Sequence, residues 1–382
     1  MPAYEELLVF CREGLKNCIN LRRCTWTRDG SVNSWILKAL QECHNLRELE
    51  INGNHNGHYD AIILPQFENL QKISLIMPSG PVLDVLPSWI NATGSILRSL
   101  TLICKASGLV TDHMLQALAT NLPMLEHLHI VGCPKVTHKG VWHLVSANKG
   151  LIGLGLENLA QTFDMSDFST RCTLSGSLLR LRSITLTINT QTASDIPKWL
   201  QEVEALLSLS PIEVFQVYST FAYFDASAMV AMNKFCSKIV TTHGQRLTRF
   251  AAHRMRIGMD VVLDICLRCV VLEQLFVVAH SKELNLLVTG LAGAYKLRTV
   301  HINYPFEDGI EEGSSSLVLS SDEALHLVRQ CGSTIVEFGC NTRVWQVNRV
   351  AVTDVWGRIT IEPHLSPYEN PDIPEQFMVV RS

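Results

Sequence analysis

The residues of this chain best suited to metal chemistry are a histidine pair and a cysteine pair. His127 and His129 are two residues apart, so in a strand they would share one face, which is compatible with a pair of metal ligands. Cys266 and Cys269 have the spacing of half a zinc site, but no second Cys or His pair follows at the required distance. Residues 55–60 also hold two histidines and an aspartate, although a Gly/Asn turn explains that segment more simply. We interpret the histidines as hydrogen-bonded or solvated surface groups, and expect no metal or other cofactor.

The motifs of the common enzyme classes are missing from the chain. It contains no Gly-x-Ser-x-Gly elbow, no phosphate-binding loop and no His-Glu-x-x-His sequence. Gly153 and Gly155 are two residues apart but lack the rest of a dinucleotide-binding fingerprint. We therefore predict that the protein is not an enzyme.

Composition and charge narrow the classes of partner. The 382 residues are 47% hydrophobic and carry a formal net charge of −4, and Lys and Arg form no run. This argues against binding to nucleic acid or to an anionic membrane. No secretory signal and no apolar run of about 18 residues is visible. The 12 cysteines are then best interpreted as reduced thiols of a cytoplasmic or nuclear protein.

A recurring phrase of the form Leu-x-x-Leu-x-Leu dominates the chain. It reads LRELEI at 46–51, LQKISL at 70–75, LRSLTL at 97–102 and LEHLHI at 125–130. The spacing is about 24 to 31 residues through most of the chain, which marks a solenoid of repeats. Twelve repeats are expected, with these opening residues: Leu21, Leu46, Leu70, Leu97, Leu125, Leu151, Leu181, Ile212, Leu247, Leu272, Leu297 and Ile335.

The pattern inside each repeat predicts a short strand followed by a helix. The apolar residues fall at positions one, four and six, so a strand with alternating faces suits the stretch from position three onward. Leu115, Leu118 and Leu122 then show helical spacing. A small residue, often Cys, three residues before the opening Leu fits the turn from helix to strand. We predict an α/β fold: a leucine-rich repeat solenoid curved into a horseshoe, with parallel strands on the concave face and helices on the convex face.

Several phrases resemble a known family. Gly132-Cys133-Pro134 and Val136-Thr137 resemble the cysteine-containing, ribonuclease-inhibitor-like subtype of leucine-rich repeat found in F-box proteins. Residues 24–30, 338–345 and 371–377 resemble the repeat region of fungal F-box/LRR proteins. In such proteins the repeats capture a target, and a helical module of about fifty residues upstream docks the cullin-RING ligase. Only about twenty residues precede Leu21, so the resemblance implies a cullin-RING ligase adaptor as partner only in a longer form that carries an F-box.

Three segments are expected along the chain. Residues 1–20 should form the helix of an incomplete leading repeat, 21–356 the solenoid of about twelve repeats, and 357–382 an extended C-terminal tail. The chain is interpreted either as a fragment of a longer F-box protein or as a shortened paralogue. Residues 158–180, 219–244 and 307–316 interrupt the repeat rhythm, and a helix is expected at 226–243.

The outward-facing positions five and seven of the repeats supply the candidate binding surface. Toward the C-terminal half they become richer in aromatic and amphipathic residues, which interface hot spots favour. Either this half of the concave face binds a protein target, or the residues only cover a solvated sheet. The candidate contacts are His129, Thr185, Gln216, Tyr218, His253, Phe276, His301 and Asn303.

Two functions are consistent with these observations. The first is a non-catalytic recognition module, similar to the substrate-binding half of an F-box ubiquitin-ligase subunit but without a recognisable F-box. The second is a stand-alone leucine-rich repeat scaffold or inhibitor-like binder unconnected to ubiquitin ligation. Co-purification with a cullin adaptor would separate them.

Overall fold

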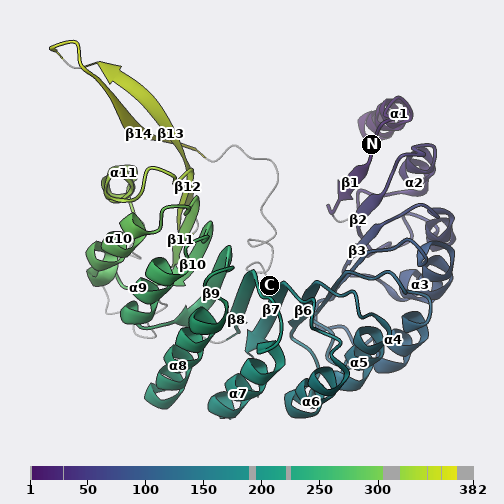
Figure 1. The fold of residues 1–382 in the computed structure, drawn as a ribbon. Helices are drawn as coiled ribbons and strands as arrows, with labels where there is room; N and C mark the ends of the chain where they lie inside the picture. Colours follow the sequence, from purple (N-terminus) through teal and green to yellow (C-terminus); the bar gives the residue numbers. More distant parts are fainter. Residues whose placement is uncertain are drawn as a thin grey trace, which may run out of the picture. The chain divides into compact units, whose positions relative to one another are not determined.

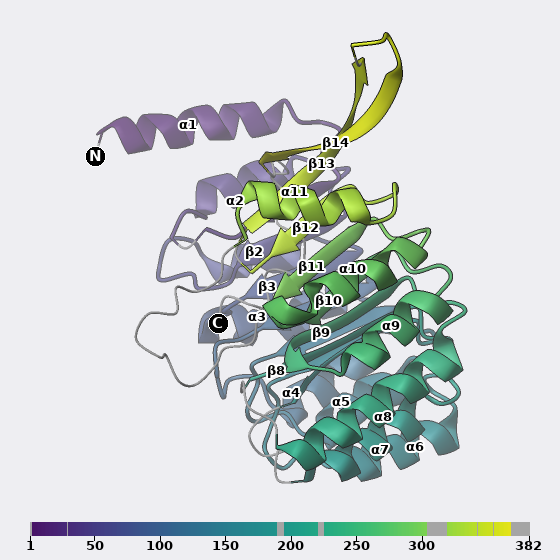
Figure 2. The same cartoon turned by 90° about the vertical axis from the view of Figure 1, so that its left-hand side faces the viewer.

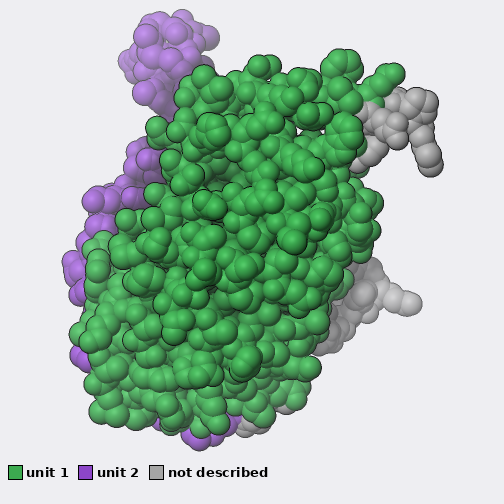
Figure 3. Space-filling model, turned by 90° about the vertical axis from the view of Figure 1, so that its right-hand side faces the viewer, with its two compact units in different colours: residues 1–182 green, residues 183–382 purple. Residues whose placement is uncertain are grey.

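The computed structural model describes residues 2–28, 30–188, 195–220, 225–303, 319–341, 343–353 and 355–367. The chain divides into two compact units, Met1–Arg182 (unit 1) and Ser183–Ser382 (unit 2), which Figure 3 colours separately. The expected loop at 307–316 and the expected tail from residue 368 onward lie outside the described residues.

Unit 1 contains six parallel strands, each paired with the next in chain order (Figure 1). The strands are β1 (Arg23–Trp26), β2 (Glu48–Asn52), β3 (Lys72–Ile76), β4 (Ser99–Ile103), β5 (His127–Val131) and β6 (Gly153–Glu157). The helices are α1 (Pro2–Lys16), α2 (Ser34–Gln41), the 3-10 helix η1 (Ala61–Gln66), α3 (Gly80–Thr93), α4 (Asp112–Ala119), α5 (His138–Ala147) and α6 (Met165–Ser175). Sequence-adjacent helices pack against each other on one side of the sheet.

Unit 2 repeats the same plan and then changes it at the C-terminal end. Its strands are β7 (Ser183–Ile188), β8 (Val214–Ser219), β9 (Arg249–Arg256), β10 (Gln274–Val278), β11 (Thr299–Asn303), β12 (Glu337–Cys340), β13 (Arg343–Thr353) and β14 (Ile359–Pro367). Its helices are α7 (Ile196–Leu207), α8 (Ala226–His243), α9 (Met259–Arg268), η3 (Ser281–Glu283), α10 (Leu284–Gly293) and α11 (Ser321–Gln330). β7 to β12 are parallel, whereas β12–β13 and β13–β14 are antiparallel.

The leucine-rich repeat solenoid predicted from the sequence is confirmed in both units. All of β1 to β12 begin two residues after the predicted opening residue of their repeat. Paired strands align equal repeat positions, as in Leu100↔Leu128 and Leu128↔Leu154, and these three side chains are completely buried. Each repeat therefore buries its apolar positions against the same positions of its neighbours.

Polar caps fix where the helices begin. Asn33, Thr111 and Asp225 each accept a hydrogen bond from a backbone N–H in the first turn of α2, α4 and α8. Such caps satisfy amide groups that would otherwise lack a partner. The helix expected at 226–243 is confirmed as α8, Ala226–His243.

The small residues expected before each opening leucine lie at the turn from helix to strand. A Cβ atom on Gly94 would overlap the carbonyl oxygen of Asn121 in the next repeat. Cys43 and Cys269 are buried at the corresponding positions, and the Cys43 thiol lies 3.5 Å from the carbonyl oxygen of Leu15. Close contact between successive turns therefore limits the size of the residue there.

The end of unit 2 differs from the sequence expectation. The sequence predicts solenoid at 343–353 and an extended tail at 359–367, but β13 and β14 form one antiparallel hairpin that crosses the boundary expected at Trp356. The repeat phrase stops at β12, so the alternation of Val and Ile in this segment belongs to a hairpin. Figure 2 shows the hairpin extending beyond α11.

Candidate functional site

The open face of unit 2, which is the sheet face opposite the helices, holds a row of four neighbouring rings, of which only Phe276 and His301 are stacked face to face. Tyr218 on β8, His253 on β9, Phe276 on β10 and His301 on β11 come from four consecutive strands. Their ring centroids are 6.4 Å apart for Tyr218–His253, 5.5 Å for His253–Phe276 and 6.0 Å for Phe276–His301. We call these four residues the ring ladder.

The ring ladder is far less accessible than the sequence suggested. Phe276 is 1% exposed, Tyr218 and His301 are 4% exposed, and His253 is 7% exposed. Thr185 at 8% is also buried. The outward-facing positions are therefore filled by contacts between neighbouring strands, and these five side chains cannot contact a partner directly without rearrangement.

The accessible candidates are polar. Gln216 and Asn303 are half-buried members of the open face of unit 2, and the Gln216 side-chain amide donates to the hydroxyl of Thr185 at 3.2 Å. His129 is half-buried on the open face of unit 1, where its ring lies against Gly155. His127 lies in the same way over Gly153. The side chains of this histidine pair are thus placed by packing across the next strand.

Burial keeps the histidines of the ring ladder neutral. It lowers the pKa of both His253 and His301 to about 4, and the neighbouring His301 and Arg249 add to the effect on the pKa of His253. Nε2 of His301 lies 2.9 Å from the carbonyl oxygen of Asn341, so this nitrogen carries the proton and donates it. Gly339 on β12 leaves room for the ring, because a Cβ there would overlap Nδ1 of His301.

An irregularity in β9 brings a cation to the edge of the ladder. The pairing of β9 with β8 is regular up to the pair Tyr218↔His253. The pairing of β9 with β10 is interrupted, because Ala251 pairs with Phe276 and the next pair is Arg256 with Val278. Arg254, inside this bulge, has a φ of 56°, which is rare for a residue with a side chain. Bulges and positive-φ residues of this kind are concentrated near functional sites.

The side chains of the bulge are held by specific bonds. The exposed Arg254 donates to the Tyr218 hydroxyl at 3.4 Å, and Arg256 pairs with Glu283 at 2.8 Å. Burial alone would raise the pKa of Glu283, but the N–H of His280 and the Arg256 guanidinium lower it below its usual value. The sequence carries no signal for this arrangement, since the repeat spacing between Leu247 and Leu272 is ordinary.

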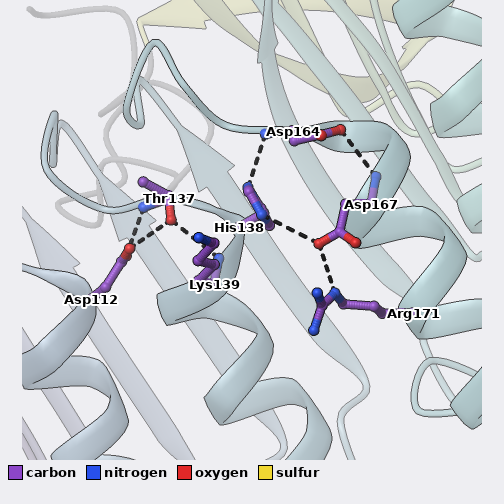
Figure 4. Close-up of polar contacts among 7 residues, drawn as sticks. All are labelled: Asp112, Thr137, His138, Lys139, Asp164, Asp167 and Arg171. Carbon is purple, nitrogen blue, oxygen red and sulfur yellow. Dashed lines mark hydrogen bonds and ion pairs between the residues drawn. The ribbon is translucent and has the colours of Figure 1, made fainter.

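A second polar network lies at the helix N-termini of unit 1, and Figure 4 shows its residues. Nδ1 of His138 accepts the backbone N–H of Asp164 at 3.1 Å, so the ring proton is on Nε2, which faces Asp167 at 3.3 Å. Asp167 also binds Arg171 at 2.6 Å. This histidine–carboxylate pair has both ring nitrogens occupied, so it is unsuited to general-base chemistry and instead joins α5 to α6.

The neighbouring link in the same network joins α4 to α5. Asp112 accepts the backbone N–H of Thr137 at 2.7 Å and its hydroxyl at 2.5 Å, while Thr137 caps α5 (Figure 4). We expect Asp112→Ala to lower the unfolding free energy by about 1–3 kcal/mol, because the half-buried amide and hydroxyl of Thr137 lose their acceptor. Urea unfolding measures the change, and Asp112→Asn, which keeps one acceptor oxygen, should cost less than half as much. Equal losses in the two variants would contradict this role.

Metal and thiol chemistry can be judged for the described residues. Within them, no group of three His, Cys, Asp or Glu side chains could hold a metal ion. Burial raises the pKa of both Cys266 and Cys269 to about 12, so these thiols stay protonated at neutral pH. None of the helices in the described ranges is long and apolar enough to cross a membrane.

Comparisons with known proteins yield distant structural similarity. The leucine-rich repeat-containing protein LegL7 from Legionella pneumophila is 12% identical, over 88% of this chain and 92% of that one, with a TM-score of 0.40. TLR13 in its complex with ssRNA13 is also 12% identical, over 85% of this chain and 55% of that one, with a TM-score of 0.31. No protein-family model and no curated protein matches this chain significantly. At such low TM-scores the similarity carries no argument, and the leucine-rich repeat fold rests on the twelve repeats of the chain itself.

Proposed function

We propose that the chain is a non-catalytic recognition solenoid that binds a protein through the open face of unit 2. The observation that supports this most is Arg254, held in a left-handed conformation at the β9 bulge and bonded to the Tyr218 hydroxyl. A strained, exposed cation that is bonded to the edge of a buried aromatic row is a preorganised polar contact on a rigid base, and preorganisation lowers the entropic cost of binding. The guanidinium suits a carboxylate on the partner.

The eight candidate contacts then divide into two roles. Gln216 and Asn303 would meet the partner beside Arg254 on the open face of unit 2, and His129 would be a contact of unit 1. Thr185, Tyr218, His253, Phe276 and His301 would hold the accessible groups in place from beneath. Binding in this scheme depends on a polar, accessible rim supported by a buried aromatic row.

Charge reversal at Arg254 tests this proposal. Arg254→Glu should reduce the recovery of a specific protein at least about tenfold in affinity purification from the native cell, since about 1.4 kcal/mol of binding is lost. Arg268→Glu is the matched control, because Arg268 is exposed on α9, on the helical side of the same unit. If Arg254→Glu retains every protein that the unaltered chain retains, the open face of unit 2 is not the binding surface.

The link to ubiquitin ligation is a narrower proposal that rests on the sequence resemblance alone. Under this narrower proposal the recovered protein is a ligase substrate, and a longer version of the chain that carries an F-box also binds a cullin adaptor. The alternative, a stand-alone scaffold or inhibitor, requires the target and excludes the adaptor. Immunoblotting for the adaptor in the same purification distinguishes the two.

A further inference from the structure

The hairpin β13–β14 is a two-stranded ribbon whose tip extends from unit 2, while its base is held by α11 beside β14 and by Arg349, which donates to the carbonyl oxygens of Ser333 and Gly332. β12 pairs with β13 only at residues 343–346, whereas β13 and β14 pair over 345–353 and 359–367. Beyond Val347 every residue of β13 is exposed, and Ile359 and Ile361 on β14 are each 71% exposed. An isolated two-stranded ribbon is marginal in water, so its outer half needs a further strand or surface for stability.

The outer edge of β13 carries backbone groups with no strand beside them. The N–H of Val347 donates to the carbonyl oxygen of Val336 at 2.8 Å, on the side of β13 away from β14. Since backbone groups alternate along a strand, those of Arg349, Ala351 and Thr353 point to the same side. Among the described residues, no strand pairs with β13 there.

The outer edge of β14 is blocked by proline. Pro363 lies opposite Arg349, and Pro367 lies opposite Trp345. The backbone N–H and C=O groups of Arg349 and Trp345 point away from β14. In an antiparallel pair the opposite residues then point away as well, so the nitrogens of the two prolines face the outside of the hairpin. Proline has no N–H, so this edge lacks two donors, which is a common protection against pairing with another strand. One edge of the hairpin is therefore closed, and the other is open.

We propose that the open edge of β13 pairs with the same edge of a second copy of this chain, forming a four-stranded antiparallel sheet. With Ala351 opposite Ala351, Arg349 falls opposite Thr353 and Val350 falls opposite Val352. This register exchanges about six backbone hydrogen bonds, at the pairs of Ala351 with itself and of Arg349 with Thr353.

The open edge is complementary to itself, which points to a second copy. In the proposed register no two like charges are opposite each other, and like charges opposite each other would be destabilising. Val350 and Val352, which are 42% and 40% exposed in one chain, take the non-hydrogen-bonded pairs, where opposite side chains are closest. Ile359 and Ile361 of both copies lie on the other face of the sheet, on its two outer strands. The contact is small, so we expect a dissociation constant on the order of micromolar.

Sedimentation velocity on the full chain, from about 1 to about 100 µM, tests the proposal. The unaltered protein should pass from monomer to dimer across this range. Ala351→Pro removes an outward N–H without removing a β13–β14 hydrogen bond, and should raise the dissociation constant at least tenfold. Ile361→Pro is the matched control, because it removes an outward N–H from the closed edge of β14 and should leave the dimer unchanged. Near-UV circular dichroism checks that both variants are folded.

A charge pair tests the register without proline. Ala351→Lys and Ala351→Glu should each be monomeric, because each places two like charges opposite each other, while an equimolar mixture should dimerise. A monomer at every concentration would overturn the proposal, as would a dimer that survives Ala351→Pro, one that Ile361→Pro abolishes, or a mixture that stays monomeric. Dimerisation here is independent of the recognition function proposed for the open face of unit 2, which Arg254→Glu tests separately.

Discussion

Replacing Phe276 by alanine is expected to lower the unfolding free energy by about 3–5 kcal/mol. The side chain is 1% exposed and lies between the rings of His253 and His301, so its removal leaves a cavity at the centre of the ring ladder. Urea unfolding followed by circular dichroism measures the loss. Tyr295→Ala is the control, because Tyr295 is 82% exposed in the same unit and should cost less than about 0.5 kcal/mol.

This result has a consequence for any binding experiment on the open face of unit 2. Alanine at Tyr218, Phe276 and His301 together would remove three buried rings, and a loss of partner binding would then report unfolding. The accessible Arg254 is the better probe, since its side chain is exposed and its bond to the Tyr218 hydroxyl is long, at 3.4 Å. A small effect of Phe276→Ala, similar to that of Tyr295→Ala, would mean that the ladder is open to solvent after all.

Stability should fall steeply as the pH is lowered from about 6.5 to about 4. The pKa of His253, His301 and His243 is lowered to about 4 in the folded chain, chiefly by burial, against about 6.5 when unfolded. Between these values the unfolded chain binds protons that the folded chain does not, so each histidine costs up to about 3 kcal/mol by pH 4. Urea unfolding at pH 7, 6, 5 and 4.5 gives the profile.

Glu157 acts in the opposite direction and provides a control. Burial raises its pKa to about 7, so the folded chain holds a proton that the unfolded chain releases above about 4.5. The stability from this group is complete below pH 4.5 and is lost as the pH rises through 7. Glu157→Gln should therefore steepen the decline on acidification, and His253→Gln should flatten it. A flat profile for the unaltered chain would contradict the burial of these histidines.

The sequence could predict the repeats because the signal is periodic. Twelve separate phrases report the same geometry, so an error in one does not change the register of the others, and each of β1 to β12 begins where the phrase predicts. The small residue expected three residues before each opening leucine, such as Gly94, is a local signal of the same kind.

The sequence could not predict which outward positions remain accessible. Alternation places Phe276 and Gln216 on the same open face, but burial depends on the side chains of neighbouring strands, which lie 25 or more residues away in the chain. The β9 bulge depends on a change in pairing partner between β8 and β10, which leaves no mark in the repeat spacing. The sequence does not reveal the hairpin, because its Val and Ile residues match the composition of the solenoid although the Leu-x-x-Leu-x-Leu phrase is absent there.

The glycines that lie against ring side chains limit which rearrangements of its repeats this chain can tolerate. Gly153, Gly155 and Gly339 each lie beside a histidine of the preceding repeat, whose ring occupies the space that a Cβ would need. A large ring in one repeat is thus matched by a glycine, which has no side chain, in the next repeat. Repeats of this chain are therefore not interchangeable modules: deleting, duplicating or shuffling one would set bulky groups against each other, and the order of the repeats is tied to the fold.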